Sequence, residues 1–334
     1  MKDFSIIIPT KDRGEVFEKT LRTALLSIEN FNAEIIVVND SSQHLQALKP
    51  HPKLTYLNNP KSGAASARNF GALHADAILL LFLDDDMLLS KDHLDVILSH
   101  SLKEPTHIYL LNWTYPPELE ATLQRTKFGR YLLSQRYTSL EGWLGSGKHW
   151  KQPLPFEHSG IASYCLPILK KTFMEVGGYD EDIPYAGAED ADFTERLKKH
   201  KLSFFILPFA TLFHNEEDRI GLTQWLQRKK RGGITLRVAT EKGNQTTAQH
   251  YTKARISIYR ISLAVKSIFT SFAYLTPNFR VFDPLYRKLI HFLTAISLFE
   301  GYQEGASVRY IQAKPTGAKA STIIADSWPN NQTS

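Results

Sequence analysis

Apolar runs of strand length alternate with helix-like segments over the first 110 residues of the chain. The strands are expected at Phe4–Pro9, Glu34–Val38, Leu54–Leu57 and Ile78–Leu83, and the helices at Glu15–Glu29 and Ser62–Ala75. The first helical segment has apolar residues at helical spacing, and the second is rich in Ala and Gly. Unbroken apolar strands that alternate with helices indicate an α/β fold with a mostly parallel sheet covered on both faces.

The pattern changes after this region. Residues 112–160 are rich in Trp, Tyr, Gly and Pro without a clean period, which predicts a long segment over the site. Short helices are expected at Lys171–Val176 and Ala191–His200, and a strand at Ser203–Leu207. The chain is helical and basic from about residue 221, and its composition after residue 313 is typical of disorder. We therefore expect an α/β domain over 1–220, a basic, amphipathic helical appendix over 221–312 and a disordered tail over 313–334.

Composition adds two limits. Of the 334 residues, 43% are hydrophobic and 22% are charged, which excludes a fibrous or wholly disordered protein. Cys165 is the single cysteine, so an internal disulfide and a cysteine-rich zinc site are both excluded. The first apolar run is too short for the core of a signal peptide. These features favour a reducing, cytoplasmic location.

Positive charge is concentrated in one window. Residues 219–266 hold eleven basic residues and one acid, giving +10, whereas the rest of the chain carries −4. Such a window could face nucleic acid, anionic lipid or a phosphate-bearing substrate, or it could be a solvated helix face. No recognised nucleic-acid module accompanies it. The apolar segments Ile256–Leu275 and Leu289–Phe299 are interrupted by Arg260, Lys266 and His291. This pattern is typical of amphipathic interfacial helices, which would give a peripheral membrane contact through 219–300, and ordinary packing of these helices against the main domain is the alternative.

Polar clusters follow three of the expected strands. They are Pro9–Arg13, Asp40–Ser42 and Asp84–Asp86. Ligands of parallel α/β sheets bind at the carboxyl ends of strands, so these clusters mark a candidate site. Three adjacent carboxylates repel one another, and a hard divalent cation such as Mg²⁺ or Mn²⁺ with a diphosphate would relieve that repulsion. A solvated acidic turn is the alternative for the triple Asp, and a turn or cap role is the alternative for Asp40.

An acidic group, Glu189–Asp192, opens the helix expected at 191–200. Helix capping alone would explain it, because carboxylates are favoured in a first helical turn. The order of these polar clusters along the chain is more informative than any one of them alone. Read together, they resemble the family 2 glycosyltransferases with the GT-A fold, a likeness that covers roughly residues 3–215. It is carried by Phe4–Arg13, Val37–Ser42, Ser66–Gly71, Phe82–Asp86, Val176–Glu181 and Ala188–Asp192.

The resemblance implies a role for each matching residue. Pro9, Thr10 and Arg13 would line the nucleotide pocket, Asp40 would meet the base, commonly uracil, and Arg68 would lie near the phosphates. Asp84 and Asp86 correspond to the outer positions of the DxD metal motif, with Asp85 between them. Asp86 would be the direct metal ligand, and Asp84 would lean toward the ribose or a metal-bound water. Asp190 corresponds to the catalytic base. His214 corresponds to a histidine that helps bind the metal in some relatives, and a packed or capping histidine is the alternative.

The resemblance thus implies an inverting, metal-dependent glycosyltransferase. It would use a nucleotide-sugar donor, preferably UDP-linked, and a glycan or lipid-linked acceptor, with no nucleic-acid partner. Two alternatives are a sugar-phosphate nucleotidyltransferase and a non-catalytic nucleotide- or sugar-binding relative. The first would need a Gly-rich phosphate loop after the first strand, which Pro9–Gly14 does not supply. Gly142–His149 nearly matches a phosphate loop, but it ends in His where Ser or Thr is required.

Overall fold

The structure, a computed structural model, describes residues 1–41, 50–136 and 154–307. Its larger sheet has five strands in the order β3-β2-β1-β4-β8. The strands are β1 (Lys2–Thr10), β2 (Ala33–Asn39), β3 (Leu54–Asn58), β4 (Ala77–Leu83) and β8 (Cys165–Leu169). The first four run parallel and β8 runs antiparallel to β4. The predicted α/β class with a mostly parallel sheet and a helical C-terminal region is confirmed.

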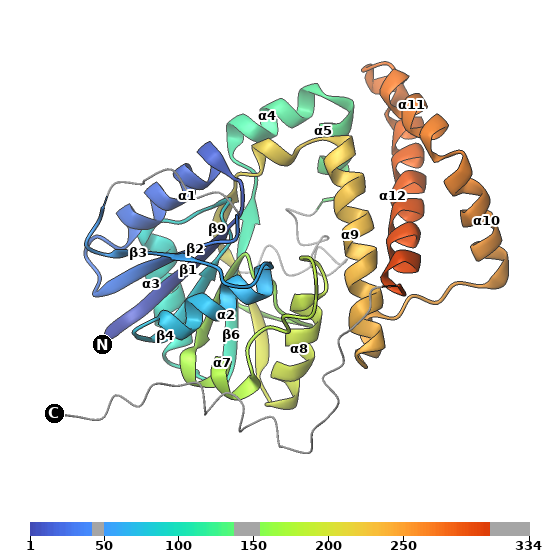
Figure 1. Cartoon of the computed structure of the whole chain (residues 1–334). Helices are drawn as coiled ribbons and strands as arrows, with labels where there is room; N and C mark the ends of the chain where they lie inside the picture. Colours follow the sequence, from blue (N-terminus) through green and yellow to red (C-terminus); the bar gives the residue numbers. More distant parts are fainter. Residues whose placement is uncertain (42–49, 137–153, 308–334) are drawn as a thin grey trace.

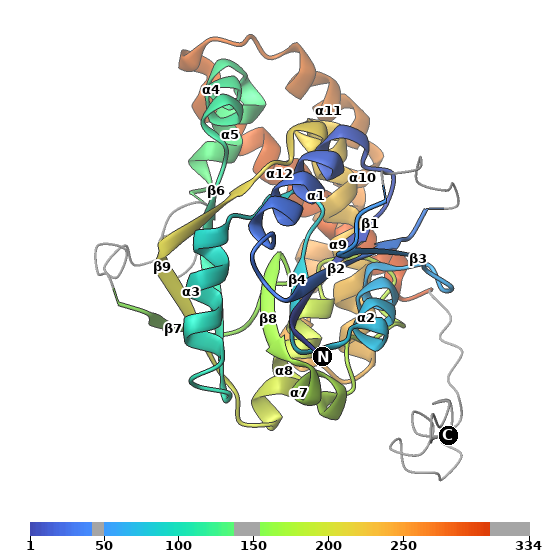
Figure 2. The same ribbon diagram turned by 90° about the vertical axis from the view of Figure 1, so that its left-hand side faces the viewer.

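Strand periodicity explains how the sheet is covered. Along β1, Ile6 and Ile8 point to one face and Ile7 to the other, because successive side chains alternate. One face packs against α1 (Gly14–Ser27) and α3 (Lys91–Ser101). The opposite face packs against α2 (Ala64–His74), α7 (Lys170–Val176) and α8 (Glu189–Lys199). Figures 1 and 2 show these helices on the two sides of the sheet.

A smaller sheet extends from the end of β4. Its path is β5-β9-β6, formed by β5 (Met87–Leu88), β9 (Ser203–His214) and β6 (His107–Thr114), with β7 (Phe156–His158) also paired to β9. β5 follows the triple Asp directly, and its Met87 lies opposite His214 in the antiparallel register. This pairing brings His214 beside the triple Asp, although 128 positions separate it from Asp86 in the sequence.

Residues 112–160 contain more regular structure than the sequence predicts. The end of β6 is followed by α4 (Pro117–Arg125) and α5 (Lys127–Ser134). Leu123 and Tyr131 on these helices pack against Trp225 and Tyr286 of the C-terminal region. The lack of a clean period there gave no indication of these two helices. Two helices of this length are too short to show a clear period, and packing against distant helices stabilises them. Gly142–His149 lies outside the described residues.

The C-terminal region is helical, as expected. It contains α9 (Leu222–Glu241), α10 (Lys253–Ala264), α11 (Lys266–Leu275) and α12 (Asp283–Gly305), with short 3₁₀ turns at Glu217–Arg219, Gln245–Thr247 and Arg280–Phe282. α9 and α12 pack with their backbones in close contact: a Cβ added to Gly301 would lie 1.8 Å from the Lys230 carbonyl oxygen, and one added to Gly233 would lie 2.2 Å from the Leu298 carbonyl oxygen. Figure 1 shows α10 and α11 outside this pair, away from the sheets.

No single helix among the described residues is both long and apolar enough to cross a membrane. α10 and α11 together reach that length and composition, but they are bent by 64° at the break between them. The predicted tail at 313–334 lies outside the described residues. The boundary at residue 220 stays a prediction, and α9 contributes side chains to the same cleft as residues 1–190.

Candidate active site

A cleft of about 550 Å³ opens at the carboxyl ends of β1, β2 and β4. Seven of the residues singled out in the sequence line it: Pro9, Thr10, Asp40, Arg68, Asp84, Asp85 and Asp86. The parallel strands end at the same edge of the sheet, which explains why residues far apart in sequence meet here. Arg13, Asp190 and His214 are not part of this lining.

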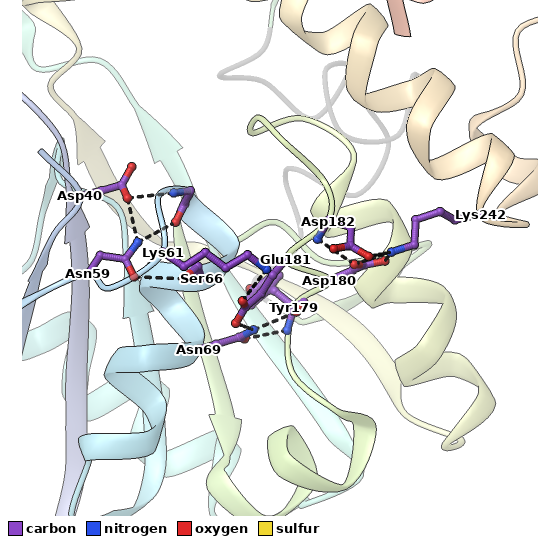
Figure 3. A network of polar contacts seen from close by, with 11 residues as sticks. Asp40, Asn59, Lys61, Ser66, Asn69, Tyr179, Asp180, Glu181, Asp182 and Lys242 are labelled. Carbon is purple, nitrogen blue, oxygen red and sulfur yellow. Dashed lines mark hydrogen bonds and ion pairs between the residues drawn. The ribbon is translucent and has the colours of Figure 1, made fainter. Parts of the chain in front are cut away.

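Asp40 organises the side of the cleft near β2 and α2. Its Oδ1 accepts hydrogen bonds from the Asn59 side-chain amide at 2.7 Å and the Gly63 backbone N–H at 2.8 Å. Its Oδ2 accepts one from the Lys11 ammonium at 3.0 Å. Figure 3 shows Asp40 beside Asn59. Both carboxylate oxygens are thus engaged by the protein, which fixes the loop before α2 and holds Lys11, another cleft residue, in place.

Arg13 lies beneath the cleft and not in its lining. Its side chain is 1% exposed, and its Nη2 donates to Asp86 at 2.6 Å. The guanidinium Nε lies 3.6 Å from Asp85 and 3.2 Å from Asp218. The expected place of Arg13 in the nucleotide pocket therefore differs from its observed position. Buried carboxylates need a buried cation, and Arg13 supplies it.

Asp86 and His214 face each other. Asp86 Oδ1 and His214 Nε2 are 3.2 Å apart. Burial alone would lower the pKa of His214, but the Asp86 carboxylate outweighs burial and raises this pKa to about 9. Burial and the adjacent Asp86 raise the pKa of Asp85 to about 6. In this corner, the negative charges of Asp85 and Asp86 are therefore offset by the positive charges of Arg13 and His214.

No group of three His, Cys, Asp or Glu residues within the described ranges forms a preassembled metal site. The donor set nevertheless fits a divalent ion. Asp86 Oδ1 and His214 Nε2 already converge, and Asp84 offers a carboxylate that is partly exposed to the cleft. Carboxylate oxygen suits Mg²⁺ and Mn²⁺, and protein sites for such ions commonly rely on substrate phosphates to complete the ligand set.

Arg68 joins the triple Asp to the start of α8. Its Nη2 lies 2.7 Å from Asp84 Oδ1 and its Nη1 lies 3.3 Å from Glu189 Oε1. The guanidinium also lies over the Tyr179 ring, with its Cζ 5.3 Å from the ring centroid. Burial would lower the pKa of Arg68, but Asp84 and other neighbours raise it, so the side chain is a permanent cation at the inner wall of the cleft.

Asp190 follows Glu189 in the first turn of α8. It accepts a hydrogen bond from the Ser163 backbone N–H at 3.1 Å and another from the Ser163 hydroxyl. Ser163 Oγ is in turn 2.6 Å from the Tyr179 hydroxyl. Burial, followed by the repulsion of Glu189, raises the pKa of Asp190 to about 7, although Arg68 and Ser163 oppose the shift. A carboxylate with this pKa is suited to accept a proton near neutral pH.

Two polar contacts hold the segment between α7 and α8 in place. Glu181 accepts a hydrogen bond from the Asn69 amide at 3.0 Å, and Asp182 pairs with Lys242 of the chain after α9 at 2.8 Å. Figure 3 shows both connections. They place Tyr185 in the wall of the cleft, where Arg231 of α9 lies over its ring.

Sequence reasoning missed the cations that α9 and its approach bring to the cleft. Arg219, Arg228 and Arg231 line it together with residues of the sheet. Arg228 pairs with Glu216 at 2.7 Å, whereas Arg231 has no carboxylate within ion-pair distance among the described residues. The basic window at 219–266 was the available signal. A phosphate-bearing substrate was one interpretation of this window, but nothing in the sequence singled out these three arginines.

Comparison with known proteins places these observations in a family. The model of glycosyl transferase family 2 matches residues 5–173, half of the chain. The validoxylamine A glucosyltransferase of Streptomyces hygroscopicus subsp. jinggangensis is 26% identical over 227 residues, which cover 59% of this chain and 51% of the relative. The chain thus spans about half the length of that relative.

An uncharacterized glycosyltransferase of Haemophilus influenzae is 25% identical over 255 residues, which cover 75% of this chain and 77% of the relative. Among solved structures, GalNAc-T7 with UDP, GalNAc and Mn²⁺ is 13% identical with a TM-score of 0.48, covering 75% of this chain and 53% of that one. The family match confirms the resemblance read from the sequence. The chain belongs to glycosyl transferase family 2, and its mixed α/β sheet is of the GT-A class.

Proposed function

We propose that this protein is an inverting glycosyltransferase that moves a sugar from a nucleotide-sugar donor to a hydroxyl group of a glycan or lipid-linked acceptor. One observation carries the proposal: a cleft at the strand ends contains both carboxylates and arginines, and Arg68 links it through Glu189 to the helical turn that holds Asp190, whose pKa is raised to about 7. UDP is the preferred nucleotide of the proposed donor, as the family resemblance implies.

The nucleoside would occupy the part of the cleft formed by Pro9, Thr10 and Asp40. Both oxygens of Asp40 already accept hydrogen bonds, so a base or ribose donor would share Asp40 Oδ2 or displace Lys11 from it. Lys11 could then contact the ligand, because its side chain is about half exposed. This arrangement gives Asp40 a positioning role together with its proposed role in recognition.

Asp86 and His214 would hold a divalent cation, Mn²⁺ or Mg²⁺, with Asp84 and Asp85 beside them. When bound, the ion supplies positive charge for the leaving diphosphate. Arg68 remains charged at the same wall, and Arg219, Arg228 and Arg231 also line the cleft. We assign these arginines to phosphate groups of the donor or of a lipid-linked acceptor, because guanidinium groups bind phosphate in a bidentate manner.

Asp190 would act as the general base. Its carboxylate takes the proton of the acceptor hydroxyl, and the oxygen attacks the anomeric carbon. A new C–O bond forms as the bond to the nucleoside diphosphate breaks, so the electron pair leaves on the diphosphate and the configuration inverts. Ser163 orients the base through two hydrogen bonds, which leave the second lone pairs of the carboxylate for the acceptor.

A peripheral membrane contact through residues 219–300 and a cytoplasmic location complete the proposal. Together they would allow a lipid-linked acceptor to reach the site. Nucleic acid is not among the proposed partners. The arginines of the basic window that line the cleft are assigned to a small phosphate-bearing ligand instead.

The test is a reaction panel with the full chain. UDP-, GDP- and dTDP-sugars are incubated with Mn²⁺ and simple glycoside or lipid-phosphate acceptors, and nucleotide release and glycosylated product are both measured. The proposal predicts nucleoside diphosphate and product in equal amounts from one donor class. Parallel reactions with UTP and a sugar 1-phosphate address the alternative, which the family match does not favour. Pyrophosphate release there, without transfer from any nucleotide sugar, would overturn the proposal.

A further inference from the structure

An apolar surface lies where α11 is followed by the turn into α12. Ile268, Phe272 and Leu275 of α11 follow one another at four- and three-residue spacing, so they share a helix face. Phe279 and Val281 continue the surface through the turn. With Leu285 at the start of α12, these six residues form what we call the apolar tip, and their side chains are 53% to 78% exposed. A monomeric soluble protein rarely leaves such a contiguous group in water.

The apolar tip is held rigidly by α5. Lys127 donates hydrogen bonds to the carbonyl oxygens of Tyr274 at 2.7 Å and Thr276 at 2.5 Å. Arg130 binds both oxygens of Asp283 at 2.7 Å each. The turn between α11 and α12 is therefore fixed on both sides by charged side chains. A preformed surface loses less conformational entropy when it docks than a flexible loop would.

The helical segment that carries the apolar tip is rich in cations, and three of them, Arg280, Arg287 and Lys288, are close in sequence to tip residues. Residues 251–288 contain seven basic residues and a single acid, Asp283. Asp283 is engaged by Arg130, and Lys266 is paired with Glu300. The remaining six cations are exposed and have no carboxylate within ion-pair distance among the described residues; they are Lys253, Arg255, Arg260, Arg280, Arg287 and Lys288. The surface thus combines large apolar side chains with uncompensated positive charge.

The structure also divides the basic window into two parts. Arg228 and Arg231 of α9 face the cleft, where they serve the small ligand. α10, whose three cations are exposed, lies beyond the α9–α12 pair, as Figure 1 shows. The basic residues of the window at 219–266 are therefore divided between the cleft and α10.

We propose that the apolar tip inserts into the headgroup–acyl boundary of an anionic bilayer, while the exposed Arg280, Arg287 and Lys288 beside it bind lipid phosphate. Apolar residues on one face with basic residues around them are the pattern of helices that lie in the interface. Juxtaposed cations strengthen that attachment on anionic membranes. The 64° bend between α10 and α11, with Lys266 at the bend paired to Glu300, favours lying in the boundary over crossing it.

This inference deepens the membrane contact of the proposed function and rests on it, but it does not depend on the transferase chemistry. Docking and catalysis can therefore be measured separately. Hydrolysis or transfer of a soluble donor reports the cleft alone, and vesicle binding reports the apolar tip alone. A negative result in the vesicle assay would leave the proposed transferase activity untouched, and a negative result in the turnover assay would leave the proposed membrane docking untouched.

The experiment is co-sedimentation of the full chain with vesicles made from equal parts of phosphatidylglycerol and phosphatidylcholine, and with vesicles of phosphatidylcholine alone. The variants are Phe272→Ser with Leu275→Ser, and Arg280→Glu with Arg287→Glu. Leu26→Ser is the matched control, because Leu26 is 65% exposed on α1, outside the apolar tip. Soluble-donor turnover and light-scattering mass are measured on every variant.

We expect the wild type to bind the anionic vesicles in a salt-sensitive way. The serine pair should weaken binding at least about tenfold, because each large side chain contributes through its buried area. The glutamate pair should remove the preference for anionic lipid. Leu26→Ser should bind as the wild type does, and turnover should stay unchanged throughout.

Wild-type-like binding of the serine pair would overturn the proposal, as would equal binding of the wild type to both vesicle types. A dimeric wild type that becomes monomeric in the serine pair, with no vesicle binding, would also overturn it and would assign the apolar tip to a second copy of the chain.

Discussion

Arg68 pairs with Asp84 at 2.7 Å, and this contact links the end of β4 to the helix that carries the proposed base. The link is completed by the second arm of the guanidinium, which reaches Glu189 at 3.3 Å. The charge near the diphosphate position and the position of Asp190 therefore depend on one buried side chain.

Replacement of Arg68 by Met should destabilise the fold. Asp84 and Glu189 would lose their common cation, and breaking a buried ion pair from one side costs about 3–5 kcal/mol of unfolding free energy. Urea unfolding monitored by circular dichroism measures this loss. Arg68→Lys should recover part of it, since the charge remains without the forked geometry. An unchanged urea midpoint in Arg68→Met would show that the bridge is not structural.

Asp190→Asn should abolish most of the turnover. Removing a general base lowers kcat by about 10²- to 10⁴-fold, because the acceptor hydroxyl then has no group to take its proton. Asp192→Asn is the matched control, since Asp192 lies in the same helical turn and pairs with Arg196. Initial rates of nucleotide release in the presence of acceptor provide the measurement. Equal losses in the two variants would point to a disturbed helix and against a proton-transfer role.

The rate of the wild type should depend on pH through Asp190. Burial raises the pKa of this carboxyl to about 7, and only the deprotonated form can accept a proton. We therefore expect kcat to rise as the pH rises through about 7 and to level off above it. The raised pKa also means that folding becomes less favourable as this group ionises, so Asp190→Asn should be at least as stable as the wild type above that pH. Thermal unfolding at pH values on both sides of 7 tests the second point.

Ser163→Ala should move the same pH profile. The Ser163 hydroxyl and backbone N–H donate to the Asp190 carboxylate, and such hydrogen bonds favour its charged form. Loss of the hydroxyl should raise the pKa of Asp190 further, so the rising limb of kcat shifts to higher pH while the plateau is largely kept. A variant with a lower plateau and an unshifted limb would contradict the assigned positioning role.

Gly301→Ala should loosen the contact between α9 and α12. An added Cβ would lie 1.8 Å from the Lys230 carbonyl oxygen, a backbone atom that cannot move aside without shifting a helix. Overpacking of this kind costs about 1–3 kcal/mol. Thermal unfolding and limited proteolysis within α9 should both show the effect. Gly232→Ala is the control, because nothing lies within 4 Å of its added Cβ.

The sequence was sufficient for the parallel sheet and for the strand-end carboxylates, because local apolar runs define buried strands and the fold class fixes where they end. It also paired His214 with Asp86 through the family resemblance, and the structure brings the two within 3.2 Å. The two residues meet because the two-residue strand β5 pairs antiparallel with β9. A strand this short leaves no pattern that can be recognised in the sequence. Ser163 was missed because it lies in a loop, 27 positions from Asp190.

The burial of Arg13 and the cleft-facing arginines of α9 could not be read from the sequence either. Both depend on how distant elements pack, and a charge run alone does not reveal which of its members faces a ligand. The same reason explains α4 and α5, whose apolar faces have a partner only once the C-terminal helices are in place.

Binding of UDP, GDP and dTDP measured by calorimetry, first with Mn²⁺ and then with excess EDTA, tests the central claim most directly. The account predicts that one nucleotide, preferably UDP, binds with Mn²⁺ and loses most of its affinity in EDTA, and that Asp86→Asn behaves as the wild type does in EDTA. Absence of binding for all three nucleotides with Mn²⁺ present would contradict the account and would remove the nucleotide-sugar mechanism.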